Sequence, residues 1–432
     1  MKQNTPGLDV RPRTYACITL GCKSNQYDTA AIASGMETYG MARSEPESAD
    51  ILIVNTCMVT GPTEAQCRQA IRRARRANPG ARVIVTGCMS KGAPGQLVRM
   101  PEVDQVVDPA EKGKIPEMLG FSETVPWVDW PEDPGVGVDG RDRGFLKIQD
   151  GCDHSCSYCI VPSVRGKSRS LAPGKVAMAI RKLMEGGRCE VVLTAIHLGL
   201  YGKDQSPAVN LDDLLWRLLD EDLPGRIRLS SMEPLEITGR LLEIMASSPG
   251  RICRHLHIPL QSGSDRVLQA MGRPYLRDDF TRIVHRAGEM VPGIGIGCDV
   301  ICGFPGETED DFSRTEDLIR SLAIPFLHAF PYSPRPGTRS AGMSDDVPHR
   351  VKKARVRTLR EVAAGNLRDF LDGLVGAELT VVPENSWNGG GTVALADNYA
   401  RVVLEGVEGL SPGSLVTAAI VERDGLFLRG VR

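Results

Sequence analysis

Short β-prone segments alternate with helical segments from residue 15 to residue 330 of this 432-residue chain. In the first third, the apolar segments "YACITL", "DILIVNT" and "RVIVTG" are each followed by a stretch with helical spacing of its apolar residues. Such an alternation is typical of parallel sheets, because parallel neighbours need a crossover connection, usually a helix. The sequence therefore predicts an N-terminal parallel α/β domain, which we assign to residues 13–125.

Six further strand–helix units follow in the middle of the chain. We expect their strands at "FLKIQ", "EVVLTAI", "RIRLSS", "HLHIPL", "GIGCDVICGF" and "PFLHAF". Six βα units in succession predict an incomplete parallel (β/α)6 barrel, whose chemistry belongs at the C-terminal ends of the strands. We assign residues 140–368 to this domain.

The last part of the chain has a different pattern. From about residue 373, short β-prone segments alternate with turns rich in Gly, Asn and Pro. Strands of this length and spacing predict a small all-β barrel or sandwich. We assign residues 369–432 to it, so the predicted fold class is α/β followed by a small β domain.

The composition sets limits on the class of protein. With 41% hydrophobic and 25% charged residues, the chain is typical of globular proteins, and no apolar run approaches the roughly 18 residues of a membrane span. The N-terminus also lacks the apolar stretch of a secretory signal. We therefore expect a cytoplasmic protein with no membrane partner. Twelve cysteines in a reducing compartment favour metal ligation or redox chemistry over disulfides.

Three cysteines each follow a predicted strand of the N-terminal domain. Cys22, Cys57 and Cys88 end the segments "ITLGC", "IVNTC" and "VTGC". Because parallel strands end at the same edge of a sheet, where ligands bind, we expect these thiols to converge. A buried core thiol is the alternative for each cysteine taken singly, but the threefold repetition of the position favours a ligand set.

The segment "CDHSCSYC" places Cys152, Cys156 and Cys159 on the first loop over the barrel mouth. A ferredoxin-type run would need a fourth nearby cysteine followed by proline, and the segment has neither. Structural zinc requires four closed ligands, so a zinc knuckle completed by His154 is an alternative. Three cysteines around a four-iron, four-sulfur cube leave one iron open to a substrate or cofactor.

This C-x3-C-x2-C spacing on a six-unit barrel resembles the radical S-adenosylmethionine superfamily. The upstream segments "LGCKSNQYDT", "NTCMVT" and "TGCMS" narrow the resemblance to the methylthiotransferases. The resemblance implies two [4Fe–4S] clusters: a cluster on Cys152, Cys156 and Cys159 that cleaves S-adenosylmethionine, and an auxiliary cluster on the upstream cysteines. Catalysis then belongs to the clusters, and we assign no catalytic side chain beyond them.

Further residues at the barrel mouth are candidates for contact with the cofactor. They are Tyr158 between two ligands, Gln261 and Ser262 in "PLQSGS", and Gly303 and Gly306 in "CGFPGE". His197 and Glu233 also fall at strand ends, and we give neither a proton-transfer role. The other cysteines lack a converging pattern and are interpreted as core thiols: Cys17, Cys67, Cys189, Cys253, Cys298 and Cys302.

The segments "RLSSMEP" and "AIHLGLYG" resemble members of the family that act on N6-threonylcarbamoyladenosine in tRNA. The implied function is conversion of this nucleoside, beside the anticodon, to its 2-methylthio derivative. Its partners would be S-adenosylmethionine, the tRNA anticodon stem-loop and an electron donor such as flavodoxin or ferredoxin. In one alternative, the enzyme performs the same chemistry on isopentenyl-adenosine in tRNA or on a ribosomal-protein aspartate. A second alternative is a non-catalytic, zinc-stabilised RNA-binding protein.

Binding of RNA must come from local features, because the net charge of the chain is −2. The C-terminal segment is similar to the RNA-binding TRAM barrel, where Trp387 and Tyr399 are candidates for stacking on bases, with a place in the core of this small domain as the alternative. Two basic helical runs are candidates for phosphate contact, with a solvated helix face as the alternative. They are Arg68, Arg72, Arg73, Arg75 and Arg76, and Arg350, Lys352, Lys353, Arg355, Arg357 and Arg360.

Overall fold

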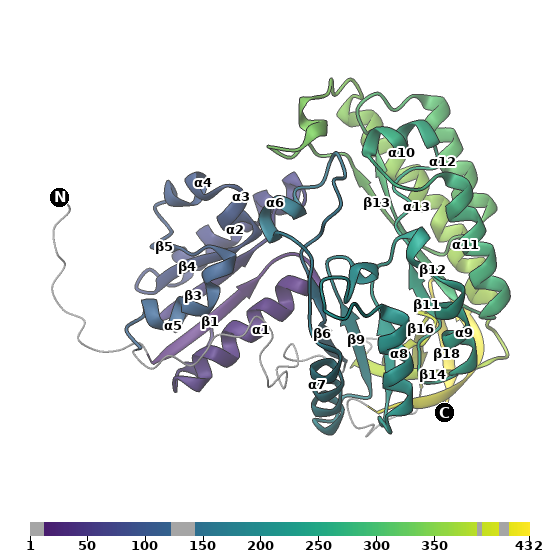
Figure 1. Ribbon diagram of the computed structural model, residues 1–432, viewed down its shortest axis with the longest axis horizontal. Coiled ribbons are helices and arrows are strands. Elements are labelled where there is room, and N and C mark those ends of the chain that lie inside the picture. Colours follow the sequence, from purple (N-terminus) through teal and green to yellow (C-terminus); the bar gives the residue numbers. More distant parts are fainter. Residues whose placement is uncertain (1–12, 122–142, 387–390, 406–413) are drawn as a thin grey trace. The chain divides into compact units, whose positions relative to one another are not determined.

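The computed structural model describes residues 13–121, 143–386, 391–405 and 414–432 (Figure 1). The chain divides into two compact units. The first contains the described residues up to 121 together with Ser163–Arg165, and the second contains the rest. Among the described helices, none is both long and apolar enough to cross a membrane.

The first unit is built on a parallel sheet with the strand order β2-β1-β3-β4-β5. Its strands are β1 (Thr14–Thr19), β2 (Ala42–Arg43), β3 (Ile51–Thr56), β4 (Arg82–Gly87) and β5 (Gln105–Val106). Every residue of the central strand β3 is buried. This explains why its sequence is a continuous apolar run rather than an alternation, since both faces of a parallel sheet are covered.

Helices connect the strands of this sheet, as the sequence predicts. They are α1 (Lys23–Thr38), α2 (Gly61–Ala77), α3 (Cys88–Gly92), α4 (Pro94–Val98) and α5 (Ile115–Met118), with a 3-10 turn η1 (Pro109–Lys114). Helix α2 begins at a Thr60 cap, whose side chain accepts a hydrogen bond from the backbone of Thr63 at 3.3 Å. Pro62 stands in its first turn, where a missing N–H costs nothing.

The second unit contains six parallel strands in two sheets, β6-β9-β10 and β11-β12-β13. The strands are β6 (Gly144–Lys147), β9 (Glu190–Thr194), β10 (Arg226–Leu229), β11 (His255–His257), β12 (Gly295–Cys302) and β13 (Phe326–Pro331). Parallel bridges from Ile227 to Ile252 and from Ser231 to His257 join the two sheets. All six predicted barrel strands are therefore confirmed, and a short antiparallel pair, β7 (Gln149–Asp150) and β8 (Arg169–Ser170), accompanies them.

The helices of this unit lie outside the curved sheet, as Figure 1 shows for α11 and α12 beside β12 and β13. They are α7 (Pro173–Glu185), α8 (Leu211–Asp220), α9 (Gly239–Ser247), α10 (Asp265–Met271), α11 (Arg277–Met290), α12 (Glu309–Ser321) and α13 (His349–Asp372), with 3-10 turns η2 (Leu198–Leu200), η3 (Pro234–Glu236) and η4 (Arg339–Gly342). The short helix α6 (Val161–Arg165) belongs in its last three residues to the first unit. The predicted 368/369 boundary falls inside α13, and the segment 122–142 lies outside the described residues. The domain boundaries therefore stay a prediction.

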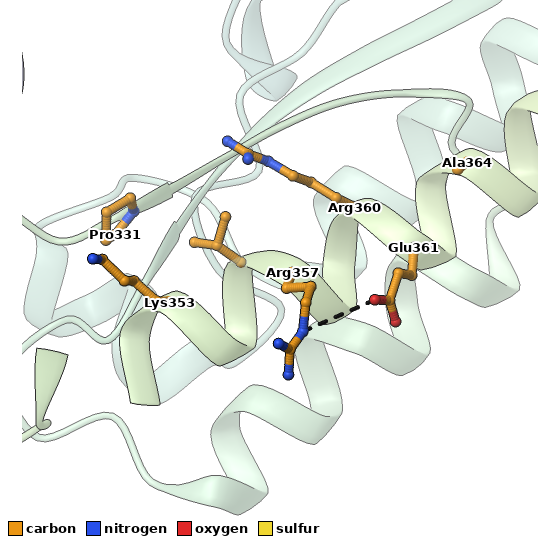
Figure 2. Close-up of a pocket in the computed structure, with 7 residues that line it drawn as sticks. Pro331, Lys353, Arg357, Arg360, Glu361 and Ala364 are labelled. Carbon is orange, nitrogen blue, oxygen red and sulfur yellow. Dashed lines mark ion pairs between the residues drawn. The ribbon is translucent and has the colours of Figure 1, made fainter. Parts of the chain in front are cut away.

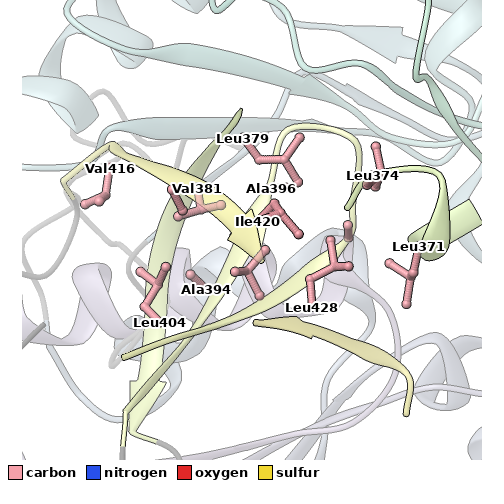
Figure 3. Packing of buried hydrophobic residues seen from close by; sticks show 13 residues of the cluster. Leu371, Leu374, Leu379, Val381, Ala394, Ala396, Leu404, Val416, Ile420 and Leu428 are labelled. Carbon is pink, nitrogen blue, oxygen red and sulfur yellow. The ribbon is translucent and has the colours of Figure 1, made fainter. Parts of the chain in front are cut away.

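A closed five-stranded barrel ends the chain, which confirms the predicted small β domain. Its strands, in the order β14-β15-β16-β18-β17, are β14 (Glu378–Ser386), β15 (Thr392–Ala396), β16 (Arg401–Leu404), β17 (Val416–Asp424) and β18 (Phe427–Val431). Inward-facing side chains such as Val381, Ala394 and Leu428 fill its centre, and Leu371 and Leu374 join them from the end of α13 (Figure 3).

A buried charge cluster joins this small barrel to the (β/α)6 barrel. Glu190 accepts hydrogen bonds from Arg226 at 2.8 Å and from Arg228 at 2.7 Å. The same two arginines donate to backbone carbonyls of the small barrel, including Thr380 at 2.8 Å and Asp397 at 2.9 Å. Because these charges are fully buried, they are stable only when all of their partners are present.

Tyr399 takes part in this junction. Its ring stacks on His255 at 4.3 Å between centroids, and the Arg228 guanidinium lies 5.3 Å from its centre. The structure thus gives the Tyr399 ring a packing role within the protein, where the sequence suggested base stacking. Trp387, the other candidate for stacking, lies outside the described residues.

Candidate active site

Cys22, Cys57 and Cys88, here called the sheet-edge trio, lie at the carboxyl ends of the neighbouring strands β1, β3 and β4. Cys22 caps the start of α1, and Cys88 is the first residue of α3. Burial raises the pKa of Cys57 to about 12, with further contributions from Cys88 and Cys22. The thiols are thus close enough to interact electrostatically, as expected from the topology. Their role as ligands stays a prediction.

Two glycines allow the strand ends to approach each other. Gly21 has a φ angle of +105°, and a Cβ atom there would lie 2.5 Å from the Cβ of Cys57. Gly87 has a φ angle of +95°, and its Cβ would lie 2.3 Å from the carbonyl oxygen of Thr56. No other residue fits these positions without moving the backbone that carries the thiols.

Asn25 ties two of these strand ends together. Its side-chain nitrogen donates to the carbonyl oxygens of Leu20 at 2.8 Å and Thr56 at 3.0 Å. Asn55 in turn donates to the backbone oxygen of Asn25 at 2.9 Å. The asparagine was not singled out from the sequence, although it stands only three residues after Cys22.

A buried arginine lies beside the sheet-edge trio. Arg165 donates to the side-chain oxygen of Asn25 and to Asp28 at 3.3 Å. Lys112 donates to the other oxygen of Asp28 at 2.7 Å. Burial raises the pKa of Cys88, and the neighbouring Arg165 acts in the opposite direction. A fixed positive charge therefore favours thiolate at this trio.

Cys67, interpreted from the sequence as a core thiol, is fully buried and contacts the sheet-edge trio. The backbone N–H of Cys57 donates to the Cys67 sulfur at 3.3 Å, and the Cys67 thiol donates to the Cys57 carbonyl at 3.3 Å. Cys67 thus fixes the backbone of a candidate ligand. No spacing rule in the sequence links the two residues, because the contact depends on how α2 packs against β3.

Cys152, Cys156 and Cys159, here called the barrel-loop trio, lie on the loop between β7 and α6, and all three are half-buried. The buried side chain of Gln149 donates to the carbonyl of Gly151 at 2.7 Å and holds the start of this loop. Burial raises the pKa of Cys159 to about 12, with Cys156 and Cys152 adding to the rise. The structure thus brings these three thiols together as well.

Arg273, two residues after the end of α10, was not predicted from the sequence as a neighbour of the barrel-loop trio. Its side chain is 3% exposed and forms an ion pair with Glu233. The same guanidinium donates to the Cys156 sulfur at 3.1 Å and to the Tyr158 hydroxyl at 3.4 Å. A buried cation therefore lies beside the barrel-loop trio, where it offsets the negative charge of thiolate ligands.

His197 and Glu236 contact the other end of this loop. The Nδ1 atom of His197 lies 3.5 Å from the Cys152 sulfur, and its Nε2 atom lies 2.8 Å from both oxygens of Glu236. Burial opposes protonation of the ring, but Cys152 and Glu236 outweigh it and raise the pKa of His197 to about 9. Glu236 was not predicted from the sequence. It lies in the 3-10 turn η3, three residues after the strand-end residue Glu233.

The distances between ligand atoms do not suit zinc. A zinc ion at Zn–S distances of about 2.3 Å would hold its sulfurs roughly 3.8 Å apart. In the described parts of the chain, two groups have all ligand atoms within 4.8 Å of one another: His154, His197 and Glu236, and His257, Asp299 and His328. Neither group contains a cysteine. Among the described residues, neither trio of thiols therefore forms a group with all ligand atoms within 4.8 Å of one another.

The predicted cofactor contacts lie around the barrel-loop trio. Tyr158 packs beside Met271 and Phe304. Gln261 has a left-handed φ angle of 64°, and its backbone N–H donates to the Asp299 carbonyl at 2.7 Å. Ser262 is fully buried, and its hydroxyl accepts from the Ser264 N–H at 3.2 Å. The hydroxyl of Ser262 thus already has a partner inside the protein.

Gly303 and Gly306 shape the turn after β12. The N–H of Gly303 donates to Glu307 at 2.6 Å, and the N–H of Gly306 donates to Asp346 at 3.0 Å. Their φ angles of 74° and 77° lie in the left-handed region, which favours glycine in such a strand-to-helix turn. Contact of Tyr158, Gln261, Ser262 and the two glycines with a cofactor stays a prediction.

Comparison with known proteins defines the class of this fold and site. Residues 14–108 match the family described as Uncharacterized protein family UPF0004, and residues 146–319 match the Radical SAM superfamily. The structure resembles that of the radical S-adenosylmethionine methyltransferase TsrM from Kitasatospora setae, with a TM-score of 0.56, 15% identity, and coverage of 76% of this chain and 77% of that chain. The second unit therefore has the fold of a radical SAM enzyme.

Curated relatives narrow the class further. The threonylcarbamoyladenosine tRNA methylthiotransferase MtaB of Bacillus subtilis is 36% identical over 97% of each chain. MtaB of Aquifex aeolicus is 36% identical over 93% of this chain and 98% of its own. The tRNA-2-methylthio-N(6)-dimethylallyladenosine synthase of Carboxydothermus hydrogenoformans is 34% identical over 82% of this chain and 84% of its own.

The chain belongs to the radical SAM methylthiotransferase family. It is therefore an enzyme, and the alternative of a non-catalytic, zinc-stabilised RNA-binding protein is wrong. Membership implies S-adenosylmethionine and [4Fe–4S] clusters as cofactors. The two groups of three free thiols fit this requirement in number and in chemistry.

Proposed function

We propose that this enzyme converts N6-threonylcarbamoyladenosine, beside the anticodon of tRNA, to its 2-methylthio derivative. The observation that carries the proposal is identity over nearly the whole chain to two relatives named for this nucleoside, at 36% over 97% and 93% of the chain. Relatives named for dimethylallyladenosine are less identical, at 34% over 82% and 30% over 97% of this chain. We further propose that the enzyme works in the cytoplasm with an electron donor such as flavodoxin or ferredoxin.

We assign the S-adenosylmethionine-cleaving cluster to the barrel-loop trio and the auxiliary cluster to the sheet-edge trio. When bound, these clusters supply the electron that cleaves S-adenosylmethionine and the iron that presents sulfur for transfer. The chain supplies the ligands and the surrounding charge. Burial raises the pKa of Cys57 and Cys159 to about 12, so loading with iron must displace protons from these thiols. Arg165 and Arg273 each place one buried cation beside a trio and favour that exchange.

Helix α13 offers a basic surface for the tRNA. Lys353, Arg357 and Arg360 are exposed and line a hollow of about 430 Å³ beside Pro331 (Figure 2). Arg350 is exposed one turn earlier. Cations that follow one face of a helix can contact successive phosphates. We propose that this surface binds the RNA backbone.

The predicted run of six cations is only partly available, and this corrects the sequence interpretation. Lys352 is buried and pairs with Asp345 at 2.6 Å. Arg355 is buried and pairs with Glu307 at 2.6 Å. Arg355 therefore ties α13 to the turn after β12, and Lys352 pairs with the segment that precedes the helix. On α2, Arg75 likewise donates to the Ala81 carbonyl at 2.7 Å.

The other arginines of α2 also include both a paired side chain and exposed side chains. Arg68 is partly buried and pairs with Glu64 on its own helix. Arg72, Arg73 and Arg76 remain exposed. These three are the members of the α2 run that stay candidates for phosphate contact.

Purified enzyme, reconstituted anaerobically with iron and sulfide, tests the function. It is incubated with S-adenosylmethionine, dithionite and one of two anticodon stem-loops of identical sequence, carrying either N6-threonylcarbamoyladenosine or N6-dimethylallyladenosine. Mass spectrometry of the nucleosides is expected to show the methylthio product from the first RNA. Product from the second RNA alone, or from a ribosomal-protein peptide alone, would contradict the proposal.

The basic surface of α13 has its own test. Lys353→Glu with Arg357→Glu should weaken binding of the stem-loop at least tenfold and flatten its salt dependence, because two phosphate contacts are lost. Arg282→Glu on α11, also exposed at 72% of its side chain, is the matched control and should bind normally. Equal losses in the two variants would show a general charge effect and exclude the α13 site.

A further inference from the structure

Three polar side chains meet on neighbouring strands β11, β12 and β13. His257 is paired in register with Gly297, and Asp299 is paired with His328. Because residues two apart on a strand share a face, His257, Asp299 and His328 lie on the same side of the sheet. One oxygen of Asp299 is 3.1 Å from Nε2 of His257 and 3.2 Å from Nδ1 of His328. We call these residues the His–Asp–His group.

This group lies on the inner face of the barrel. The alternate residues of β12, namely Cys298, Val300 and Cys302, are buried on the helix-covered face. The side chains of the His–Asp–His group are instead accessible, with exposed fractions of 16% for His257, 28% for Asp299 and 63% for His328. The three side chains therefore line the open interior of the barrel.

The group is close to the residues around the barrel-loop trio. His257 forms a parallel bridge with Ser231, two residues before the Glu233 that pairs with Arg273. Ile301, the next residue after Asp299 on the inner face, packs against the same cluster as Tyr158. The His–Asp–His group thus lies one pleat below the mouth where the chemistry takes place.

The group is charged rather than apolar. Burial opposes ionisation of Asp299, but hydrogen bonds from His257 and His328 outweigh it, and the pKa of the carboxyl lies below its usual value. His328 uses Nδ1 for this contact, so the second nitrogen of its exposed ring, Nε2, is not the atom that contacts Asp299. A purely hydrocarbon substituent placed here would displace water from the accessible polar atoms of this group without replacing the hydrogen bonds of that water, which costs free energy.

We propose that the His–Asp–His group is the subsite that binds the N6-threonylcarbamoyl substituent and selects it over a dimethylallyl substituent. This inference rests on the proposed function. The threonylcarbamoyl group carries a carboxylate, a hydroxyl and amide N–H groups, which imidazole and carboxylate side chains can pair. A site built to pair such groups rejects an analogue that lacks them far more strongly than an apolar site rejects an added hydroxyl.

The test measures affinity, so it does not depend on turnover. Three stem-loops of identical sequence carry N6-threonylcarbamoyladenosine, N6-dimethylallyladenosine or unmodified adenosine, and fluorescence anisotropy gives their dissociation constants. Wild-type enzyme is expected to bind the first RNA at least tenfold more tightly than the other two. His328→Leu and Asp299→Asn should each remove this preference while leaving affinity for unmodified RNA within about twofold.

His285→Leu, at an exposed histidine on α11, is the matched control and should keep the preference. The iron content of His328→Leu should match that of the wild-type enzyme, which shows that the cluster sites are intact. If wild-type enzyme methylthiolates the first RNA but binds all three equally, the subsite is wrong while the function stands. If wild-type enzyme leaves the first RNA unmodified, the proposed function itself fails. A divalent metal other than iron, bound by wild-type enzyme and lost in Asp299→Asn, would overturn the subsite in favour of a metal site.

Discussion

The sheet-edge trio takes its thiols from the ends of three strands, whereas the barrel-loop trio takes all of its thiols from one segment of eight residues. In the first, the spacing of the ligands depends on how closely the strand ends approach, which Gly21, Gly87 and Asn25 control. In the second, the chain itself fixes the spacing, and later barrel segments add charge through Arg273. The sheet-edge trio should therefore be sensitive to backbone packing, and the barrel-loop trio to electrostatics.

Removing one cysteine ligand should give the largest losses of activity. It should also distinguish the roles of the two trios. Cys152→Ala is expected to abolish both cleavage of S-adenosylmethionine and formation of product, because the cleaving cluster loses a ligand. Cys57→Ala should abolish product but keep some abortive cleavage. Chromatography of 5′-deoxyadenosine and mass spectrometry of the nucleosides measure both. Equal loss of cleavage in the two variants would show that the trios do not have separate roles.

A substitution at a non-ligand glycine should disable only the sheet-edge trio. Gly21→Ala adds a methyl group 2.5 Å from the Cβ of Cys57 and strains a φ angle of +105°. We expect the variant to bind about half of the wild-type iron and to lose product while retaining cleavage. Gly288→Ala on α11 is the control, since its added methyl group meets no atom within 4 Å. Full iron content in Gly21→Ala would mean that the strand ends can separate without losing the cluster.

Loss of the buried cation Arg273 should change the reduction potential of the cluster assigned to the barrel-loop trio. Arg273→Gln, made in the Cys57→Ala background so that one cluster is present, should lower the midpoint potential by about 60 mV, or ~1.4 kcal/mol for one electron. Removing a positive charge beside Cys156 makes addition of an electron less favourable. Redox titration followed by electron paramagnetic resonance measures the shift.

Arg273→Gln also leaves Glu233 buried without its cation, which should destabilise the fold by about 3 kcal/mol or more. The double variant with Glu233→Gln should recover most of this stability in urea unfolding but keep a lowered potential. An unchanged potential in both variants would restrict Arg273 to a structural role.

The smallest effect is expected at Cys67. Cys67→Ala removes two weak hydrogen bonds to the backbone of Cys57 and should cost about 1 kcal/mol. Cys298→Ala, at another fully buried thiol, should cost a similar amount. Only Cys67→Ala should change the paramagnetic resonance spectrum of the auxiliary cluster. Identical spectra in the two variants would show that Cys67 is an ordinary core thiol.

Much of the fold could be predicted because its signals are local. All six barrel strands, the five strands of the small barrel and the three longer strands of the N-terminal sheet follow from the period of apolar residues and the turn residues between them. The two-residue strands β2 and β5 at the edges of that sheet were not predicted. The convergence of Cys22, Cys57 and Cys88 also followed from the sequence, through the rule that parallel strands end at one edge. Helical spacing would also have separated Lys352, Arg355 and Leu359, which are buried, from Lys353, Arg357 and Arg360, which are exposed.

The sequence by itself therefore determined the order of strands and helices and the two sets of three cysteines, since both depend on neighbours along the chain. Only the tertiary structure decided which charged side chains stand beside them. Arg273 and Cys156 are 117 residues apart, and Arg165 and Asn25 are 140 apart. A buried charge is stable only where folding brings it a partner, and no local pattern records that partner. The His–Asp–His group arises in the same way, because the register of three strands brings its members into contact.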